Sequence, residues 1–130
     1  MEDELKGKNR RGSKRQAVAY TLSYGIEKPY DLRVLSGLRD DLDALMLDLS
    51  EAGMSMVCGF DLPRGSQLHI KFNFIDLFRS GQDRSRRLEL TGKVVSHTEL
   101  SSGNYRTGIS FNKISDEDKA AIVHFIRRSK

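Results

Sequence analysis

Two short polar groups in this sequence have the residue types and spacing to bind an anionic ligand. The first is the segment RGSKR (residues 11–15), in which Arg11 and Arg15 stand four residues apart and Arg10 comes directly before. Arginine is always charged in proteins, and its planar guanidinium can pair with two phosphate oxygens or stack on a flat ring. The spacing suits a compact anion, although a basic arm without a ligand would also show it by chance.

The second group is the segment DLSEAG (residues 48–53), which lies between two apolar stretches. Taken alone it predicts a tight turn, because Asp and Ser side chains bond to nearby backbone groups and Gly53 would supply a positive φ angle. The carboxylate of Asp48 accepts hydrogen bonds only, so it could also face the donor groups of a ligand. Turn capping and ligand binding both stay open for Asp48 and Ser50 at this level.

The elements that must position these groups are mostly strands. A two-residue alternation predicts a strand that begins at Ala17 and carries Tyr20, Leu22 and Tyr24 on one face. Further strands are expected over residues 42–48, 54–60, 68–74, 88–97 and 105–111, with turns at 48–53, 61–65 and 101–104. Connections are expected over residues 25–31 and 77–86, and a weaker strand over residues 32–37.

The pattern changes to a helical period at the C-terminus. Ser115 followed by Asp118 resembles a capping box at a helix start. Four residues then form an apolar stripe: Ala121, Ile122, Phe125 and Ile126. Short strands followed by one helix predict a mainly β domain, either an antiparallel barrel or a sandwich with a packed terminal helix.

Length and composition indicate a single globular domain. The chain has 130 residues and one cysteine, Cys58, which lies in an apolar stretch and is expected to be a buried, inert thiol. Residues 1–9 lack an apolar period and are expected to form a flexible tail. No signal peptide or membrane-spanning run of about 20 apolar residues is visible, so a cytoplasmic location is expected.

Together the two polar groups are far more specific than either alone. The RGSKR segment precedes the first strand, the DLSEAG segment joins two later strands, and the turn LPRG (residues 62–65) follows. The segments GKVV (residues 92–95) and GISF (residues 108–111) then precede the terminal helix. This arrangement resembles the PilZ domain family over residues from about 9 to 128.

The resemblance implies a six-stranded antiparallel PilZ-like barrel over residues 10–130, with a C-terminal α-helix and a flexible basic N-terminal arm. It also implies a bacterial receptor for cyclic di-GMP. The sequence itself shows no Ser/His/Asp arrangement, phosphate-binding loop or pair of catalytic carboxylates, so no enzymatic activity is expected. The five motif residues of the family fall on Arg11, Arg15, Asp48, Ser50 and Gly53. In this family an arginine before the motif, here Arg10, accompanies two stacked ligand molecules, so we expect two cyclic di-GMP per protomer.

The chemistry of cyclic di-GMP agrees with these residue types. The two arginines can pair with its phosphates or with guanine O6 and N7, and Asp48 can accept from guanine N1–H and N2–H₂, which selects guanine over adenine. Ser50 could donate to a guanine acceptor or a phosphate, and Gly53 would leave room for the base. We expect ligand binding to recruit the loose arm onto the barrel and so to change the surface that an unknown downstream protein meets.

Two alternatives come from other classes of function. A small β-barrel that binds RNA or single-stranded DNA would use the basic arm and the second basic segment, residues 79–87. Against it, Phe72 and Phe74 share a strand face with Leu68 and Ile70, which predicts core residues rather than an exposed stacking platform. The second alternative is a PilZ-like barrel that binds proteins and no ligand.

The remaining polar residues predict no further chemistry. His69, His97 and His124 are widely separated in the sequence and are expected to be surface residues, so no metal site is predicted. The segments 28–41 and 77–87 are longer than usual for the PilZ pattern, and the sequence assigns no function to them.

Overall fold

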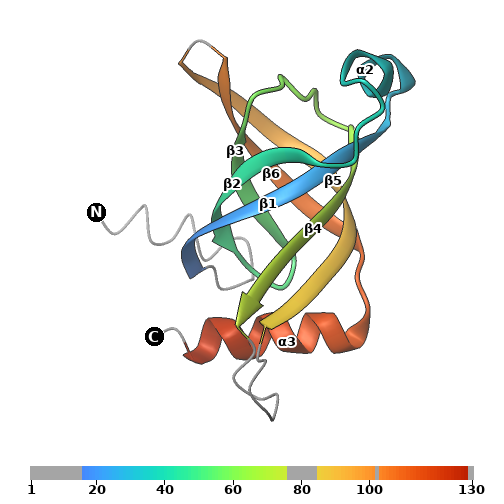
Figure 1. Ribbon diagram of the computed structural model, residues 1–130. Helices are drawn as coiled ribbons and strands as arrows, with labels where there is room; N and C mark the ends of the chain where they lie inside the picture. Colours follow the sequence, from blue (N-terminus) through green and yellow to red (C-terminus); the bar gives the residue numbers. More distant parts are fainter. Residues whose placement is uncertain (1–15, 76–84, 102, 129–130) are drawn as a thin grey trace.

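The chain folds into a closed antiparallel barrel of six strands, ordered β1-β2-β3-β6-β5-β4 (Figure 1). The structure is a computed structural model, and it describes residues 16–75, 85–101 and 103–128. The strands are β1 (Gln16–Lys28), β2 (Leu42–Leu49), β3 (Gly53–Cys58), β4 (Gln67–Ile75), β5 (Ser85–Ser101) and β6 (Asn104–Lys113). Two helices complete the described residues, α2 (Tyr30–Leu35) and α3 (Asp116–Arg128). The prediction of a six-stranded barrel with a C-terminal helix is confirmed.

The barrel interior is filled by the apolar faces that the alternation predicted. On β4, Leu68, Ile70 and Phe72 are buried, and on β1 the same holds for Leu22 and Tyr24. Cys58 is also buried, as expected. Each buried apolar side chain contributes about 1.5–3 kcal/mol of transfer free energy, so these faces hold the strands in register.

Strand β1 is longer than the sequence suggested, and the predicted connection over residues 25–31 is wrong in its first half. Ile26 is fully buried and pairs with Leu68 of β4, which extends the sheet to Lys28. Gly25 allows this extension, because a β-carbon there would overlap Asp40. The glycine thus marks a close approach of two segments rather than a turn.

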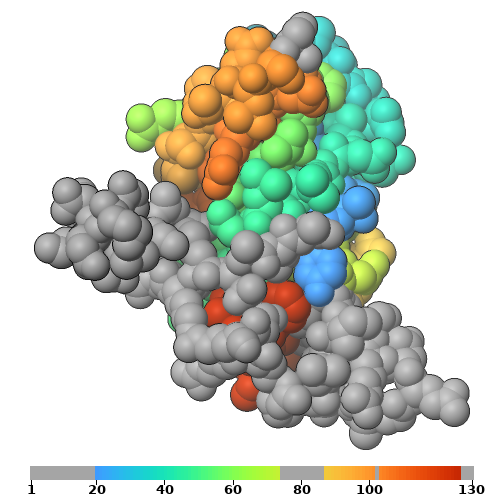
Figure 2. All heavy atoms as spheres, turned by 90° about the vertical axis from the view of Figure 1, so that its left-hand side faces the viewer, coloured from blue at the N-terminus to red at the C-terminus, as the bar shows by residue number. Residues whose placement is uncertain are grey.

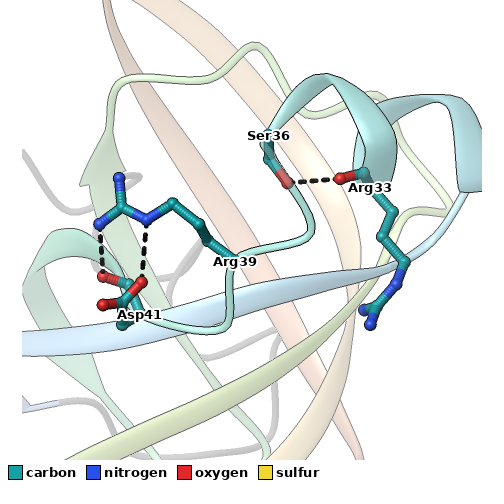
Figure 3. Close-up of polar contacts among 4 residues, drawn as sticks. All are labelled: Arg33, Ser36, Arg39 and Asp41. Carbon is teal, nitrogen blue, oxygen red and sulfur yellow. Dashed lines mark hydrogen bonds and ion pairs between the residues drawn. The ribbon is translucent and has the colours of Figure 1, made fainter.

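The weaker strand predicted over residues 32–37 is also wrong, because α2 occupies most of that range. The backbone N–H of Arg33 donates to the carbonyl of Pro29 (3.1 Å), and the guanidinium of Arg33 donates to the carbonyl of Ile26 (3.1 Å). The hydroxyl of Ser36 donates to the carbonyl of Arg33 (2.8 Å; Figure 3). Local hydrogen bonds therefore hold this short helix, and no residue within it is buried.

The turn after α2 is also held by polar contacts. Leu38 adopts a positive φ of 60°, which is uncommon outside glycine. Arg39 Nε lies 2.9 Å from Asp41 Oδ1 and closes the turn before β2 (Figure 3). Several apolar side chains stay exposed in and beside α2, namely Tyr30, Val34, Leu35 and Leu38.

Helix α3 lies across the end of the barrel at which β1 begins (Figure 1). Its predicted cap is confirmed, because the backbone N–H of Asp118 donates to Ser115 Oγ (3.1 Å). Ile122 and Ile126 are buried, and the ring of Phe125 packs against Tyr20 of β1 with centroids 5.9 Å apart. Neither described helix is long and apolar enough to cross a membrane.

Candidate functional site

The turn between β2 and β3 carries the predicted polar group, and a β-bulge decides which way Asp48 faces. Ala44 and Met46 of β2 point into the barrel, so strict alternation would send Asp48 inward as well. The pairing of β2 with β3 shifts between Met46 and Asp48. After the shift Leu49 is fully buried, while the Asp48 side chain keeps 19% of its surface exposed. The bulge therefore turns the carboxylate to the outer surface.

Asp48 lies in a row of polar side chains that crosses three neighbouring strands. Its Oδ2 accepts a hydrogen bond from Ser55 Oγ of β3 (2.7 Å) and lies 3.5 Å from Nη2 of Arg106 on β6. The same nitrogen of Arg106 is 3.5 Å from Ser55 Oγ. Figure 2 views the molecule from the side on which β2 and β3 lie, with the β5–β6 hairpin in orange beside them. We call these three residues the Asp48 cluster.

Ser50 holds the turn together from inside. It is fully buried, and its Oγ accepts from the backbone N–H groups of Ala52 (3.2 Å) and Gly53 (3.1 Å). The hydroxyl donates to the carbonyl of Gly53 at 3.2 Å, and the backbone N–H of Ser50 donates to the same carbonyl at 2.8 Å. These contacts give Ser50 a turn-capping role, which was one of the two interpretations left open by the sequence.

Position 53 requires glycine for a reason other than the positive φ expected from the sequence. The described glycines with positive φ are Gly37, Gly65 and Gly103, so the predicted positive φ at Gly53 is wrong. Gly53 instead pairs with Ser110 of β6, and a β-carbon at this position would overlap the carbonyl oxygen of Ile109. Only a residue without a side chain lets β3 and β6 approach this closely.

The register of β1 against β2 brings the start of the described chain to the same turn. Gln16 pairs with Leu49, and Ala17 pairs with Asp48. The predicted ligand residues Arg10, Arg11 and Arg15 lie outside the described residues, and so does the predicted flexible tail (residues 1–9). Arg15 nevertheless directly precedes Gln16 in the chain, and the backbone of Gln16 pairs with Leu49, the residue after Asp48.

Two residues of the Asp48 cluster, Ser55 and Arg106, lie outside the motifs that the sequence offers. Ser55 had a weak signal, because it stands two residues after Gly53 and so shares the outward face of its strand. Arg106 had none in the local sequence, since it reaches Asp48 only through the pairing of β3 with β6. A carboxylate flanked by a hydroxyl and a guanidinium can accept and donate side by side, which suits a ligand edge that carries both kinds of group.

The other features of the described chain fit a ligand site less well than the Asp48 cluster does. A surface groove of about 280 Å³ formed by β1, β2, β4 and β5 is lined in part by Asp43, Lys71 and Arg87, and it includes no residue of the predicted site. Phe72 is buried, which removes it from any stacking platform, and the side chain of Phe74 is not described. Most of the second basic segment also lies outside the described residues.

Two of the three described histidines lie near acidic residues. His69 Nε2 lies 3.5 Å from Glu89 Oε1, and His97 Nδ1 lies 3.0 Å from Asp61 Oδ1. His124 is exposed on α3, in agreement with the surface position expected. Within the ranges that the structure describes, no group of three or more His, Cys, Asp or Glu residues could hold a metal ion.

Comparison with known proteins identifies the family. The family model of the PilZ domain matches residues 9–128. This chain belongs to the PilZ domain family. No curated protein sequence matches the chain significantly.

Solved structures agree with a PilZ fold. The chain is similar to the Bacillus subtilis inhibitor of motility MotI/DgrA, with a TM-score of 0.68, 16% identity, and coverage of 92% of this chain and 51% of that one. It is similar to Escherichia coli YcgR in complex with c-di-GMP (TM-score 0.59, 17% identity, coverage 92% and 46%). The PilZ domain of YcgR with c-di-GMP gives a TM-score of 0.57 at 15% identity, with coverage of 92% and 90%. The chain thus spans about half the length of the first two proteins, and these identities establish the fold alone.

Proposed function

We propose that this PilZ domain is a cytoplasmic receptor for cyclic di-GMP and not an enzyme. The observation that carries the proposal is the register of β1 with β2, in which Gln16 lies opposite Leu49 and Ala17 opposite Asp48. The basic arm therefore joins the barrel beside the turn that carries the second half of the motif. Membership of the PilZ family and the c-di-GMP complexes of YcgR, a protein of the same fold, support the same ligand.

The proposed site divides the work between the arm and the barrel. Arg11 and Arg15 supply positive charge and flat guanidinium groups for the phosphates and guanines. Asp48 supplies an acceptor for guanine N1–H and N2–H₂. Ser50 and Gly53 contribute by building the turn that presents Asp48, since the Ser50 hydroxyl is already engaged within it.

Isothermal titration with cyclic di-GMP tests the proposal. We expect the wild type to bind with a micromolar or lower Kd, which corresponds to about −8 kcal/mol or better. Arg15→Ala and Asp48→Ala each remove a charged hydrogen-bonding group and should weaken binding at least roughly 10-fold. Lys14→Ala and Asp43→Ala make the same charge changes on the same arm and strand, and they should bind like the wild type.

The controls decide between this proposal and its competitors. Absence of binding by the wild type would leave a protein-interaction module without ligand as the better description. If single-stranded RNA bound instead, with steep weakening by salt and a dependence on length, the domain would be a nucleic-acid-binding barrel. Equal loss of binding in Lys14→Ala and Arg15→Ala would mean that general charge rather than the motif is recognised.

Arg10 extends the proposal to stoichiometry. An additional arginine beside the motif adds a flat cation that can stack on a second guanine. We expect titration of the wild type to saturate at two cyclic di-GMP per protomer and Arg10→Ala to saturate at one. A wild type that saturates at one ligand would contradict this part of the proposal alone.

The signal that follows binding is proposed to be a change in the N-terminal arm. The arm is highly charged, so it has little apolar surface to bury when no ligand is bound. The phosphates of the ligand would give its arginines fixed partners. The ordered arm would then present a new surface to a downstream protein. Amide NMR of the arm tests this step: signals of residues 8–15 should broaden or shift on saturation, and unchanged mobility would exclude the switch.

A further inference from the structure

Arg106 is a cation of the barrel itself that lies at the Asp48 cluster but belongs to neither sequence motif. Its Nη2 is 3.5 Å from Asp48 Oδ2 and 3.5 Å from Ser55 Oγ. The side chain is 52% exposed, so the guanidinium reaches the cluster from the solvent side. The next residue on the same face of β6 is Gly108, which pairs with Ser55. The space outside Gly108 is taken by Ser96 of β5, because a β-carbon on the glycine would overlap Ser96 Oγ.

The contact between Arg106 and Asp48 is open to replacement by a ligand. The Arg106 side of the ion pair is exposed, so water screens its charge, and the long arginine side chain loses freedom when it is held at the carboxylate. A distance of 3.5 Å is also longer than a strong charge-assisted hydrogen bond. Arg106 can therefore leave Asp48 or share it with a ligand at small cost to the fold.

The edge of guanine that Asp48 is proposed to recognise carries both donors and an acceptor. N1–H and N2–H₂ donate, and the carbonyl O6 beside N1 accepts. A carboxylate satisfies the two donors, so O6 needs a donor from another residue, which is either an arginine of the arm or a cation of the barrel beside Asp48. A buried acceptor left without a partner costs a ligand much of its affinity, so a complete site needs a donor next to the carboxylate.

We propose that Arg106 is a specificity residue of the ligand site, which donates to guanine O6 while Asp48 accepts from N1–H and N2–H₂. The inference rests on the proposed cyclic di-GMP receptor function and adds to it a residue outside the RxxxR and DxSxxG motifs. The pair reads three adjacent groups of one base. Adenine, which carries an amino group at the position of O6, would place a donor against the guanidinium.

The test is a cycle of variant and ligand analogue. Arg106→Ala should weaken cyclic di-GMP binding roughly 10- to 100-fold, the range of one charge-assisted hydrogen bond. The analogue has sulfur in place of O6 on both guanines, and sulfur is a weak acceptor. The wild type should bind the sulfur analogue several-fold more weakly than cyclic di-GMP. Arg106→Ala should bind the two ligands with equal affinity. Arg64→Ala removes an equal charge from an exposed turn at the other end of the barrel and should behave like the wild type.

Each other outcome overturns the inference in a distinct way. Equal affinity of Arg106→Ala and the wild type would exclude a contact with the ligand. Weaker binding that keeps the full sulfur penalty would mean that Arg106 acts on a phosphate or only positions Asp48. Tighter binding by Arg106→Ala would make Arg106 a competitor for the carboxylate. If the wild type itself does not bind, the proposed function fails first; if Asp48→Ala abolishes binding and Arg106→Ala does not weaken it, only this inference fails.

Discussion

Gly53 lies so close to Ile109 that a β-carbon on the glycine would overlap the carbonyl oxygen of the isoleucine. The neighbour is backbone of the paired strand β6, so it cannot rotate away as a side chain could. We expect Gly53→Ala to lower the free energy of unfolding by about 1–3 kcal/mol, the range seen for overpacked sites. Urea denaturation monitored by circular dichroism measures the change.

Gly65 provides a matched control for that substitution. It has a positive φ of 93°, and a β-carbon there would meet nothing within 4 Å. Gly65→Ala should therefore show only the backbone strain of the left-handed region, about 1 kcal/mol. A Gly53→Ala variant no less stable than Gly65→Ala would show that β3 and β6 can separate, and the steric account of Gly53 would be wrong.

Ser50 should contribute to stability through the turn. Ser50→Ala leaves the N–H groups of Ala52 and Gly53 without the Oγ acceptor, and both Ser50 and the Gly53 donor are buried. An unpaired buried donor costs about 1–3 kcal/mol, so we expect a loss of that size in denaturation experiments. Ser110→Ala removes an exposed hydroxyl from β6 and should stay within about 0.5 kcal/mol of the wild type. A stable Ser50→Ala variant that loses ligand affinity would assign Ser50 to the ligand instead.

The strands of the barrel could be predicted because one face of each is buried. Leu68, Ile70 and Phe72 alternate because they all contact one core. Ser115 predicts the start of α3 because its capping hydrogen bond is local in the sequence. Residues 25–37 were misassigned for a physical reason. Gly25 normally indicates a turn, but here it accommodates Asp40, and α2 is held by polar contacts that leave no apolar stripe to detect.

The site was predictable only as far as its local motif extends. The DLSEAG pattern pointed to the turn, yet the outward direction of Asp48 depends on a bulge against β3. The role of Gly53 depends on Ile109, and the place of Arg106 depends on the pairing of β3 with β6. The last two relationships join residues more than 50 positions apart, and only the register of the closed barrel sets them.

Tyr24 predicts a dependence of stability on alkaline pH. The tyrosine is fully buried, and burial raises the pKa of its phenol above the usual value of about 10, with a smaller effect of the Cys58 thiol. Above pH 10 the unfolded chain therefore releases a proton that the folded chain retains. The free energy of unfolding should fall by up to about 1.4 kcal/mol per pH unit from this group.

Tyr24→Phe isolates that contribution. Denaturation between pH 9 and 12 should give a shallower decline for Tyr24→Phe than for the wild type. The Tyr24 hydroxyl has no hydrogen-bond partner of good geometry among the described residues, so near pH 7 the variant should lose little stability. Tyr30→Phe removes an exposed phenol and serves as the control. Identical slopes for wild type and Tyr24→Phe would exclude Tyr24 as the source.

Ser55 should act on ligand binding through Asp48 rather than through the ligand. Its hydroxyl donates to Asp48 Oδ2 at 2.7 Å, and Ser55 itself is only 7% exposed. Hydrogen bonds to charged groups contribute about 1.5–3 kcal/mol, so Ser55→Ala should raise the Kd for cyclic di-GMP roughly 10-fold by freeing the carboxylate to rotate. Ser55→Thr keeps the hydroxyl and suits a strand, so it should retain most of the affinity.

A double-mutant cycle separates this positioning role from direct contact. If Ser55 works only by holding Asp48, adding Ser55→Ala to Asp48→Ala should change the Kd by less than about 2-fold, because the group being positioned is already gone. Titrations of the four proteins at one salt concentration give the coupling free energy. Additive losses would mean that Ser55 and Asp48 contact the ligand independently, and the cluster would then contain two separate ligand contacts instead of one carboxylate held by its neighbour.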